Sequence, residues 1–193
     1  MVVANRTPKN NCCRENFEYH EEYKNRIKLK DGSLILLRPL KPYDSKKIEA
    51  LYETFSAQTL HYRHFNVSPY LVDRESKRLL DTLYKGELII VAVDPMHKER
   101  PFRGISELLI KSTDQTIAEC SIIISDEWQG KHLGIQMLKW LISIALSKGV
   151  KFLIGYFLAE NSKVLSILRK STYKYEIDYS WNVRFFKLFI EKE

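Results

Sequence analysis

The sequence predicts one α/β domain with a mixed, partly antiparallel sheet. Its 193 residues suit a single hydrophobic core, since such cores typically serve about 100 to 200 residues before a chain divides. Strand-like apolar runs alternate with helix-like segments through the middle of the chain, and hairpin signals stand near both ends. That order is typical of a sheet flanked by helices and extended by antiparallel edges.

The first half of the chain predicts an arm, a hairpin, three helices and a buried strand. Residues 1–24 are rich in Asn, Lys and Glu without a sustained period, so we expect a flexible N-terminal arm ahead of a domain at 25–193. Asp31-Gly32 between two apolar runs predicts either two short strands or one bent one. Asp44 predicts the cap of the first helix. The later elements are helices over 56–65 and 73–86, the second ended by Gly86, and a strand over 87–93.

The second half predicts two further hairpins around a long, apolar helix. Strands over 103–111 and 116–125 flank the turn sequence STDQ. Apolar residues then repeat at helical spacing from Leu133 to Ile144, and Gly149 ends that helix. The remaining elements are a strand over 151–158, a helix over 162–170 and a closing hairpin of 173–179 with 183–190.

Composition and charge set limits on the class of protein. No apolar run approaches the roughly 20 residues that span a bilayer, and the first residues lack the apolar core of a secretory signal. We therefore expect a cytoplasmic protein without a membrane partner. The net charge of +7 is spread over scattered basic residues with acidic ones between them, so nucleic acid is not the expected partner. Three cysteines, two of them the neighbours Cys12 and Cys13, predict free thiols.

Two glycines, Gly130 and Gly134, lie where an apolar strand feeds into an apolar helix. The first N–H groups of a helix have no partners within it, and the helix dipole places positive charge there, so anions bind such ends. Gln129 and Lys131 add donors beside the glycines. The spacing matches neither a P-loop nor a dinucleotide-binding loop. From the residues alone, a plain turn and an anion site both remain open.

The surrounding sequence favours an anion site over a plain turn, because it resembles a known family of enzymes. WQGKHLGIQML resembles the acyl-CoA loop of the GNAT superfamily of N-acetyltransferases: Gln129 and Gly134 match the ends of its pattern, and His132 stands where its middle glycine is expected. Three more segments resemble the Pat-type protein lysine acetyltransferase branch of that superfamily. They are KDGSLILLRPLKPYDSKKIEALYETFSAQTLHYRHF, IAECSIII and LAENSKVLSILRKSTYKYE, and the likeness covers about residues 26–190.

The resemblance implies the GNAT fold, in which about seven strands include splayed central strands that form an acyl-CoA cleft. It implies acetyl-CoA as cosubstrate, and no metal. The residues that match its cofactor site fall into three groups. They are Ile122, Ile123 and Ile124 for the pantetheine arm, Gln129, Gly130, Lys131, His132, Leu133, Gly134 and Ile135 for the pyrophosphate, and Asn161 for the arm again.

Glu119 is the candidate catalytic residue, because the matching Glu is the proposed general base of the Pat-type branch. Acetylation needs a neutral amine, whereas a lysine with a reference pKa of about 10.4 is almost wholly protonated near pH 7. Burial of Glu119 in an otherwise apolar strand beside the cleft is expected to raise its pKa toward a useful range. From the residues alone, an exposed strand position or a core ion pair is as good an interpretation.

Other side chains are candidates for roles in catalysis or binding. Alternation places Cys120 on the face opposite Glu119, which favours direct transfer over an acyl-cysteine route. Leu168 stands where many relatives have a Tyr that protonates the departing thiolate, and Tyr156 or Tyr173 could serve instead. His61 and His64 have no evident third ligand, so no metal site is expected. Tyr62, Arg63 and Phe65 are expected to wall the acceptor groove.

The expected function is transfer of acetyl from acetyl-CoA directly to an amine, with a protein lysine as the favoured acceptor. A small-molecule amine is the nearest alternative, and a non-catalytic acyl-CoA-binding regulatory module is another. A deep acidic pocket beside Glu119 would favour the small amine, and an open groove would favour the protein.

Overall fold

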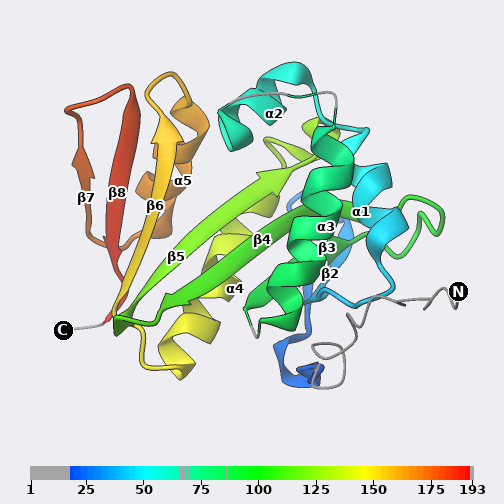
Figure 1. Cartoon of the computed structure of the whole chain (residues 1–193), viewed down its shortest axis with the longest axis horizontal. Coiled ribbons are helices and arrows are strands. Elements are labelled where there is room, and N and C mark those ends of the chain that lie inside the picture. The colour runs from blue at the N-terminus through cyan, green and yellow to red at the C-terminus, as the bar shows by residue number, and fades with distance from the viewer. Residues whose placement is uncertain (1–17, 66–67, 69, 86, 192–193) are drawn as a thin grey trace, which may run out of the picture.

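The computed structural model describes residues 18–65, 68, 70–85 and 87–191, and it has an eight-stranded sheet in the order β1-β2-β3-β4-β5-β6-β8-β7 (Figure 1). The strands are β1 (Asn25–Lys28), β2 (Leu34–Pro39), β3 (Leu88–Val93), β4 (Phe102–Lys111), β5 (Asp114–Ile124), β6 (Phe152–Leu158), β7 (Tyr175–Asp178) and β8 (Val183–Phe189). The helices are α1 (Ser45–Tyr52), α2 (Ala57–His64), α3 (Leu71–Tyr84), α4 (Leu133–Ser147) and α5 (Ser162–Ser171), with short 3-10 turns η1 (Glu21–Tyr23) and η2 (Asp126–Trp128).

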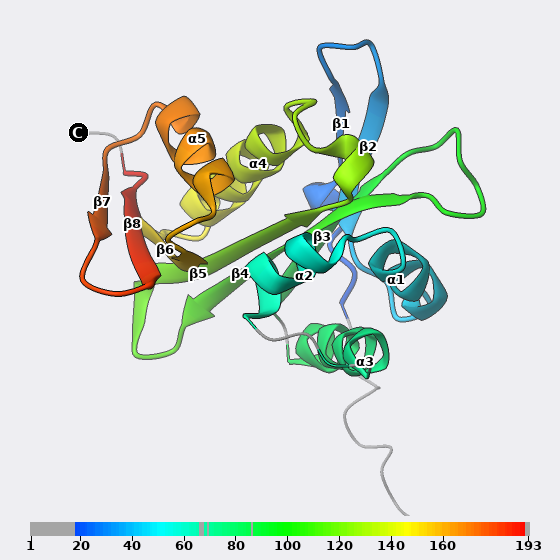
Figure 2. The same ribbon diagram turned by 90° about the horizontal axis from the view of Figure 1, so that it is seen from above.

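The predicted α/β class and mixed sheet are confirmed. Strands β5 and β6 are parallel, and the other neighbouring pairs are antiparallel. Helices α1, α2 and α3 lie on one face of the sheet, and α4 and α5 lie on the other (Figure 2). The expected count of about seven strands becomes eight because the first hairpin is two separate strands rather than one bent strand.

Apolar residues on both faces of the central strands explain this three-layer arrangement. In β3, Ile90 and Ala92 face the core beneath α4, whereas Ile89 and Val91 face the core beneath α1 and α3. A strand that is covered on both faces gains from apolar residues at every position, which is why the run ELIIVAV is continuous. The sheet is therefore a fixed platform between two cores.

The element boundaries differ from the sequence expectations by a few residues. Asp44 is the N-cap residue of α1, as predicted, but its buried carboxylate makes no capping hydrogen bond to that helix. It instead accepts two hydrogen bonds from Arg38, at 2.7 and 3.1 Å, and one from Lys47 at 2.9 Å. A guanidinium within reach satisfies a buried carboxylate better than a single backbone N–H can.

The ends of the described region complete the fold. The expected N-terminal arm falls mainly outside the described residues, as do Cys12 and Cys13. Within residues 18–24, η1 adjoins the sheet below β2, and the Trp140 indole N–H donates to the Tyr23 carbonyl at 3.1 Å. The expected helix stop at Gly86 also falls outside the described residues. No described helix combines the length and the apolar character that a bilayer crossing needs.

Candidate active site

A cleft opens where β5 and β6 part. Their pairing covers three residue pairs and ends at Glu119 with Ile154. Beyond that point the two strands diverge (Figure 1), and a cavity of about 390 Å³ lies between their ends, α2 and the starts of α4 and α5. Gly155 lies at the point of divergence, where a Cβ would come within 2.6 Å of the Phe186 ring and 2.9 Å of the Cys120 carbonyl oxygen.

Residues 129–135 form one end of the cleft, where β5 leads through η2 into α4. Gly130 and His132 both have left-handed backbone, with φ of 77° and 70°. The hydrogen bond from the Gln136 N–H to the His132 carbonyl, at 3.2 Å, belongs to the first turn of α4. The N–H groups of Leu133, Gly134 and Ile135 precede that bond, so they have no acceptors within the helix. This is the arrangement that binds anions.

The two glycines of the loop have different tasks. A Cβ on Gly130 would meet no atom within 4 Å, so its positive φ is what favours glycine there. A Cβ on Gly134 would lie 3.0 Å from the Ile167 Cδ1 atom and 3.1 Å from the Ile124 Cδ1 atom. Gly134 therefore lets α4 pack closely against α5 and β5.

The side chain of Gln129 ties the loop to its surroundings. Its amide nitrogen donates to the Ile124 carbonyl at 2.9 Å and to the Thr59 hydroxyl at 3.1 Å, and its amide oxygen accepts from Lys163. Asp126 joins the same region to α2, since it accepts the Ser56 N–H at 2.8 Å and the Thr59 hydroxyl at 2.9 Å. The Gln129 side chain therefore orients the loop through contacts within the protein, and its role in binding the cofactor stays a prediction.

Most of the predicted site residues line the cleft. The two exceptions are Lys131, which is exposed, and Leu133. The Lys131 Nζ atom lies 4.7 Å from the centre of the Trp128 ring, and the Leu133 side chain is buried in the core. Asn161 immediately precedes α5, yet its side chain makes no capping bond, and its buried Oδ1 has no hydrogen-bond partner. A buried acceptor left in this way is a place for a ligand N–H.

Glu119 lies on the wall of the cleft beside the divergence of β5 from β6. Its side chain remains 36% exposed, less buried than expected, because β6 turns away just beyond it. The carboxylate accepts a hydrogen bond from the Lys111 ammonium at 2.8 Å. That bond raises the pKa of Lys111 above its usual value. An amine is therefore held beside the candidate base by the chain itself.

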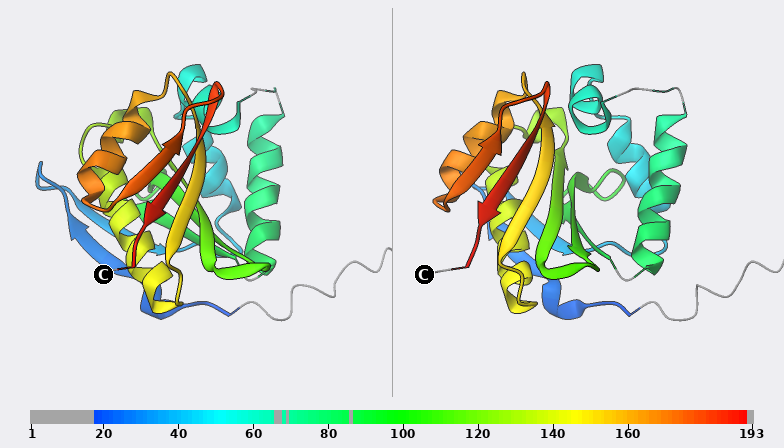
Figure 3. Two further views of the ribbon diagram at one scale, coloured as in Figure 1. Left: turned by 90° about the vertical axis from the view of Figure 1, so that its left-hand side faces the viewer. Right: turned by 60° about the vertical axis from the view of Figure 1, so that its left-hand side comes forward.

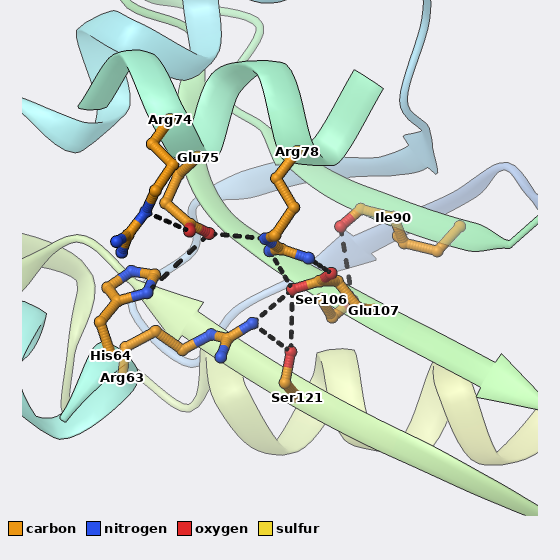
Figure 4. A network of polar contacts seen from close by, with 9 residues as sticks. All are labelled: Arg63, His64, Arg74, Glu75, Arg78, Ile90, Ser106, Glu107 and Ser121. Carbon is orange, nitrogen blue, oxygen red and sulfur yellow. Dashed lines mark hydrogen bonds and ion pairs between the residues drawn. The ribbon is translucent and has the colours of Figure 1, made fainter. Parts of the chain in front are cut away.

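A buried ionic network beside the cleft joins α2 and α3 to strands β4 and β5 (Figure 4). Glu107 on β4 accepts two hydrogen bonds from Arg78, at 2.7 and 3.0 Å, a third from Arg63 and a fourth from the Ser121 hydroxyl at 3.1 Å. Burial alone would raise the pKa of Glu107, but Arg78 and Arg63 outweigh it and lower that pKa to about 2. Arg63 is thus fixed between α2 and the sheet, and it lines the cleft with Tyr62 and Phe65, as expected.

Four other side chains considered from the sequence lie in or near the cleft. Burial raises the pKa of the Cys120 thiol to about 12, so the thiolate needed for an acyl-cysteine route is scarce near neutral pH. Of the two tyrosines considered as acids, Tyr156 lines the cleft, whereas Tyr173 packs against the core. Leu168 is buried and also lines the cleft.

Several residues in or beside the cleft were not predicted from the sequence. Lys163 and Lys170 on α5 bring positive charge to the cleft, and Thr59 and Asp126 connect α2 to the loop. The lysines could have been found from their place on the helix that follows Asn161. The pairing of Glu107 with Arg63 and Arg78 could not, because it joins residues 44 and 29 positions apart.

Comparisons with known proteins agree with this geometry. No family model matches the chain. The chain is 29% identical over 129 residues to Acetyltransferase PA5475 of Pseudomonas aeruginosa, which is 64% of this chain and 66% of that relative, so it spans just under two thirds of the relative's length. The structure resembles the GNAT domain of S. lividans PAT, with a TM-score of 0.77, 19% identity and coverage of 88% and 98% of the two chains. It also resembles YncA from Salmonella typhimurium, solved with its cofactor acetyl-CoA, with a TM-score of 0.62, 14% identity and coverage of 82% and 95%.

Proposed function

Starting from the GNAT fold of this chain, we propose that it is an acetyl-CoA-dependent N-acetyltransferase whose acceptor is a lysine side chain on a protein. The observation that carries the proposal is the cleft at the β5–β6 divergence. It has the amide-rich start of α4 at one end and the carboxylate of Glu119 on its wall. A relative named as an acetyltransferase and a neighbour solved with acetyl-CoA support the same reaction.

Acetyl-CoA would bind through the backbone more than through side chains. The N–H groups at residues 130–135 would hold the diphosphate, and Lys163 would add positive charge. The backbone of residues 122–124, beyond the end of β6 pairing, would bind the pantetheine arm, and the Asn161 Oδ1 would accept one of its N–H groups. A backbone N–H beside the thioester would contribute on the order of 3 kcal/mol as the carbonyl oxygen gains charge.

Glu119 would take a proton from the acceptor ammonium, directly or through a water, so that the neutral nitrogen can attack the thioester carbonyl. Coenzyme A would leave as a thiolate, and a thiol with a pKa of about 8.5 leaves without an obligatory acid. Tyr156, which lines the cleft, is a side chain that could supply a proton. Because the Cys120 pKa is raised, attack by the amine itself is favoured over an acyl-enzyme.

The lining of the cleft favours a single amine as acceptor. Glu119 is the one acidic side chain among the described residues that line the cleft, which also has Arg63, Lys163 and Lys170. A small polyamine would need several carboxylates, and these basic side chains would repel it. A lysine on a protein presents one ammonium group, so it suits one carboxylate.

Calorimetry with acetyl-CoA, a thiol-release assay and labelled acetyl-CoA in a cell lysate together test this function. We expect binding, release of coenzyme A and labelled proteins from the full chain, and loss of the last two in Glu119→Gln. Glu176→Gln, on the exposed edge strand β7, is the matched control and should retain them. Binding without coenzyme A release across lysate proteins and small amines would instead indicate a regulatory acyl-CoA-binding module.

A further inference from the structure

Lys111 holds one of the chain's own amines against the carboxylate of the candidate base. It is the last residue of β4, and its Nζ atom is 2.8 Å from the Glu119 Oε2 atom. A general base must lie within about 2.6 to 3.2 Å of the atom whose proton it takes. Resting on the proposed function, we propose that the chain acetylates itself at Lys111, in a reaction within one molecule.

The fold holds Lys111 in this position. Glu119 pairs with Leu109 across the β4–β5 ladder, and the register shifts between Ile110 and Lys111 at the end of the hairpin. The Lys111 side chain lies along the same pair of strands and ends at the candidate base. Glu119 itself lines the cleft, as does Tyr156. No movement of a helix or domain is needed to bring this amine to the candidate base.

The chemistry balances with acetyl-CoA as the only co-reactant. Glu119 takes one proton from the Lys111 ammonium, and the nitrogen lone pair attacks the thioester carbonyl carbon. The C–N bond forms and the C–S bond breaks, so coenzyme A leaves as a thiolate. The second proton of the attacking nitrogen passes to that thiolate, and Glu119 releases its proton to solvent. The products are N-ε-acetyl-lysine, coenzyme A and one proton.

Acetylation of Lys111 would change the cleft. It removes the positive charge of the side chain, so the ion pair with Glu119 is lost. The Glu119 carboxylate is then free to receive the ammonium of an external acceptor. Lys111 therefore acts as an internal acceptor that occupies the base until it is modified.

Lys77 provides a matched control for an ion-paired lysine outside the cleft. Its Nζ atom lies 2.8 Å from the Asp73 carboxylate, the same distance as in the Lys111 pair, but on the exposed surface of α3. Direct chemical acetylation by acetyl-CoA would treat these two lysines alike. Acetylation by the active site would modify Lys111 alone.

The test uses the purified full chain with acetyl-CoA and no acceptor, followed by digestion and mass spectrometry of each lysine. We expect acetyl on Lys111 in the unmodified chain and in Lys77→Arg, and a rate per molecule that is independent of protein concentration. Glu119→Gln should lower that rate by about a hundred-fold or more. Lys111→Arg should remove the modified peptide. Thermal melting checks that each variant is folded.

Four results would overturn the proposal. Equal labelling of Lys77 and Lys111, unaffected by Glu119→Gln, would mean direct chemical acetylation. A rate per molecule that rises with protein concentration would mean transfer between molecules. Labelled lysate proteins with an unlabelled Lys111 would reject self-acetylation and leave the proposed function standing, whereas no coenzyme A release with any acceptor would reject both.

Discussion

Glu107 and Glu119 lie on neighbouring strands and on the same face of the sheet, yet their surroundings differ in almost every respect. Glu107 is buried, and two arginines and a serine occupy its oxygens (Figure 4). Glu119 is 36% exposed and holds one flexible lysine at the edge of a cleft. The first carboxylate has no free position for a substrate, whereas the second has.

The cause of the difference is the arrangement of the neighbouring elements. Beside Glu107, α2 and α3 lie over the sheet and supply Arg63 and Arg78. Figure 3 shows α2 and α3 covering one face of the sheet. Beside Glu119, β6 turns away, and among the described residues the carboxylate is paired with Lys111 on β4 rather than with a guanidinium from a helix. The same residue type therefore stabilises the fold at one position and is free for chemistry at the other.

The largest expected effect that separates the two carboxylates is on the reaction rate. If Glu119 is the general base, Glu119→Gln should lower the acetyl-transfer rate by about two to four decades. The free energy of unfolding should change by less than about 0.5 kcal/mol, because the side chain is partly exposed. Steady-state assays and urea denaturation of the same preparation measure both. An unchanged rate would assign the proton transfer to water or another side chain.

Glu107→Gln should show the opposite pattern. Removing the charge leaves the guanidinium groups of Arg63 and Arg78 without their shared partner, which costs about 3 to 5 kcal/mol for a buried pair. Urea denaturation measures this loss. Recovery of the loss by adding Arg63→Met and Arg78→Met would support the cause, since apolar replacements of a whole buried network are often tolerated. A variant as stable as the parent would contradict the assigned role.

Mild acid should lower the free energy of unfolding through His64, which lies beside Glu75 on the Glu107 side of the cleft, before it affects the Glu119 side. Burial and the charge of Arg63 lower the pKa of His64 to about 4, against the opposing charge of Glu75, with Arg74 and Arg78 adding to the lowering. The unfolded chain binds this proton at a pKa near 6.5, so stability falls as the pH falls from about 6.5 toward 4. Between pH 7 and pH 5 we expect a loss of about 2 kcal/mol from this group. Denaturation at both values measures it, and His64→Gln should reduce the slope.

The smallest expected effect concerns the backbone of the loop at the other end of the cleft. His132 has a φ of 70°, which costs a residue with a side chain about 1 to 2 kcal/mol more than glycine. His132→Gly should raise the free energy of unfolding by about 1 kcal/mol, after the greater flexibility of glycine in the unfolded chain is subtracted. Thermal melting measures this change. A clear loss of stability would mean that the imidazole makes a contact of greater value than the strain.

Local sequence signals predicted the fold well, and they predicted the partners of the site residues poorly. The continuous apolar run of β3 and the helical repeat of α4 predicted their elements because burial imposes those patterns. Local spacing predicts Asp44 at the start of α1, but it does not show that the carboxylate pairs with Arg38 instead of capping the helix. Likewise the sequence predicts Glu119 in a strand, but it cannot show that Lys111 contacts its carboxylate. Side-chain partners depend on register and on packing between distant segments.

The position of acetyl-CoA in a crystal structure of the full chain is the decisive measurement. We expect the diphosphate on the backbone N–H groups of residues 130–135 and the thioester between residues 122–124 and the Glu119 carboxylate. A diphosphate bound elsewhere, or a thioester outside the β5–β6 divergence, would contradict this expectation.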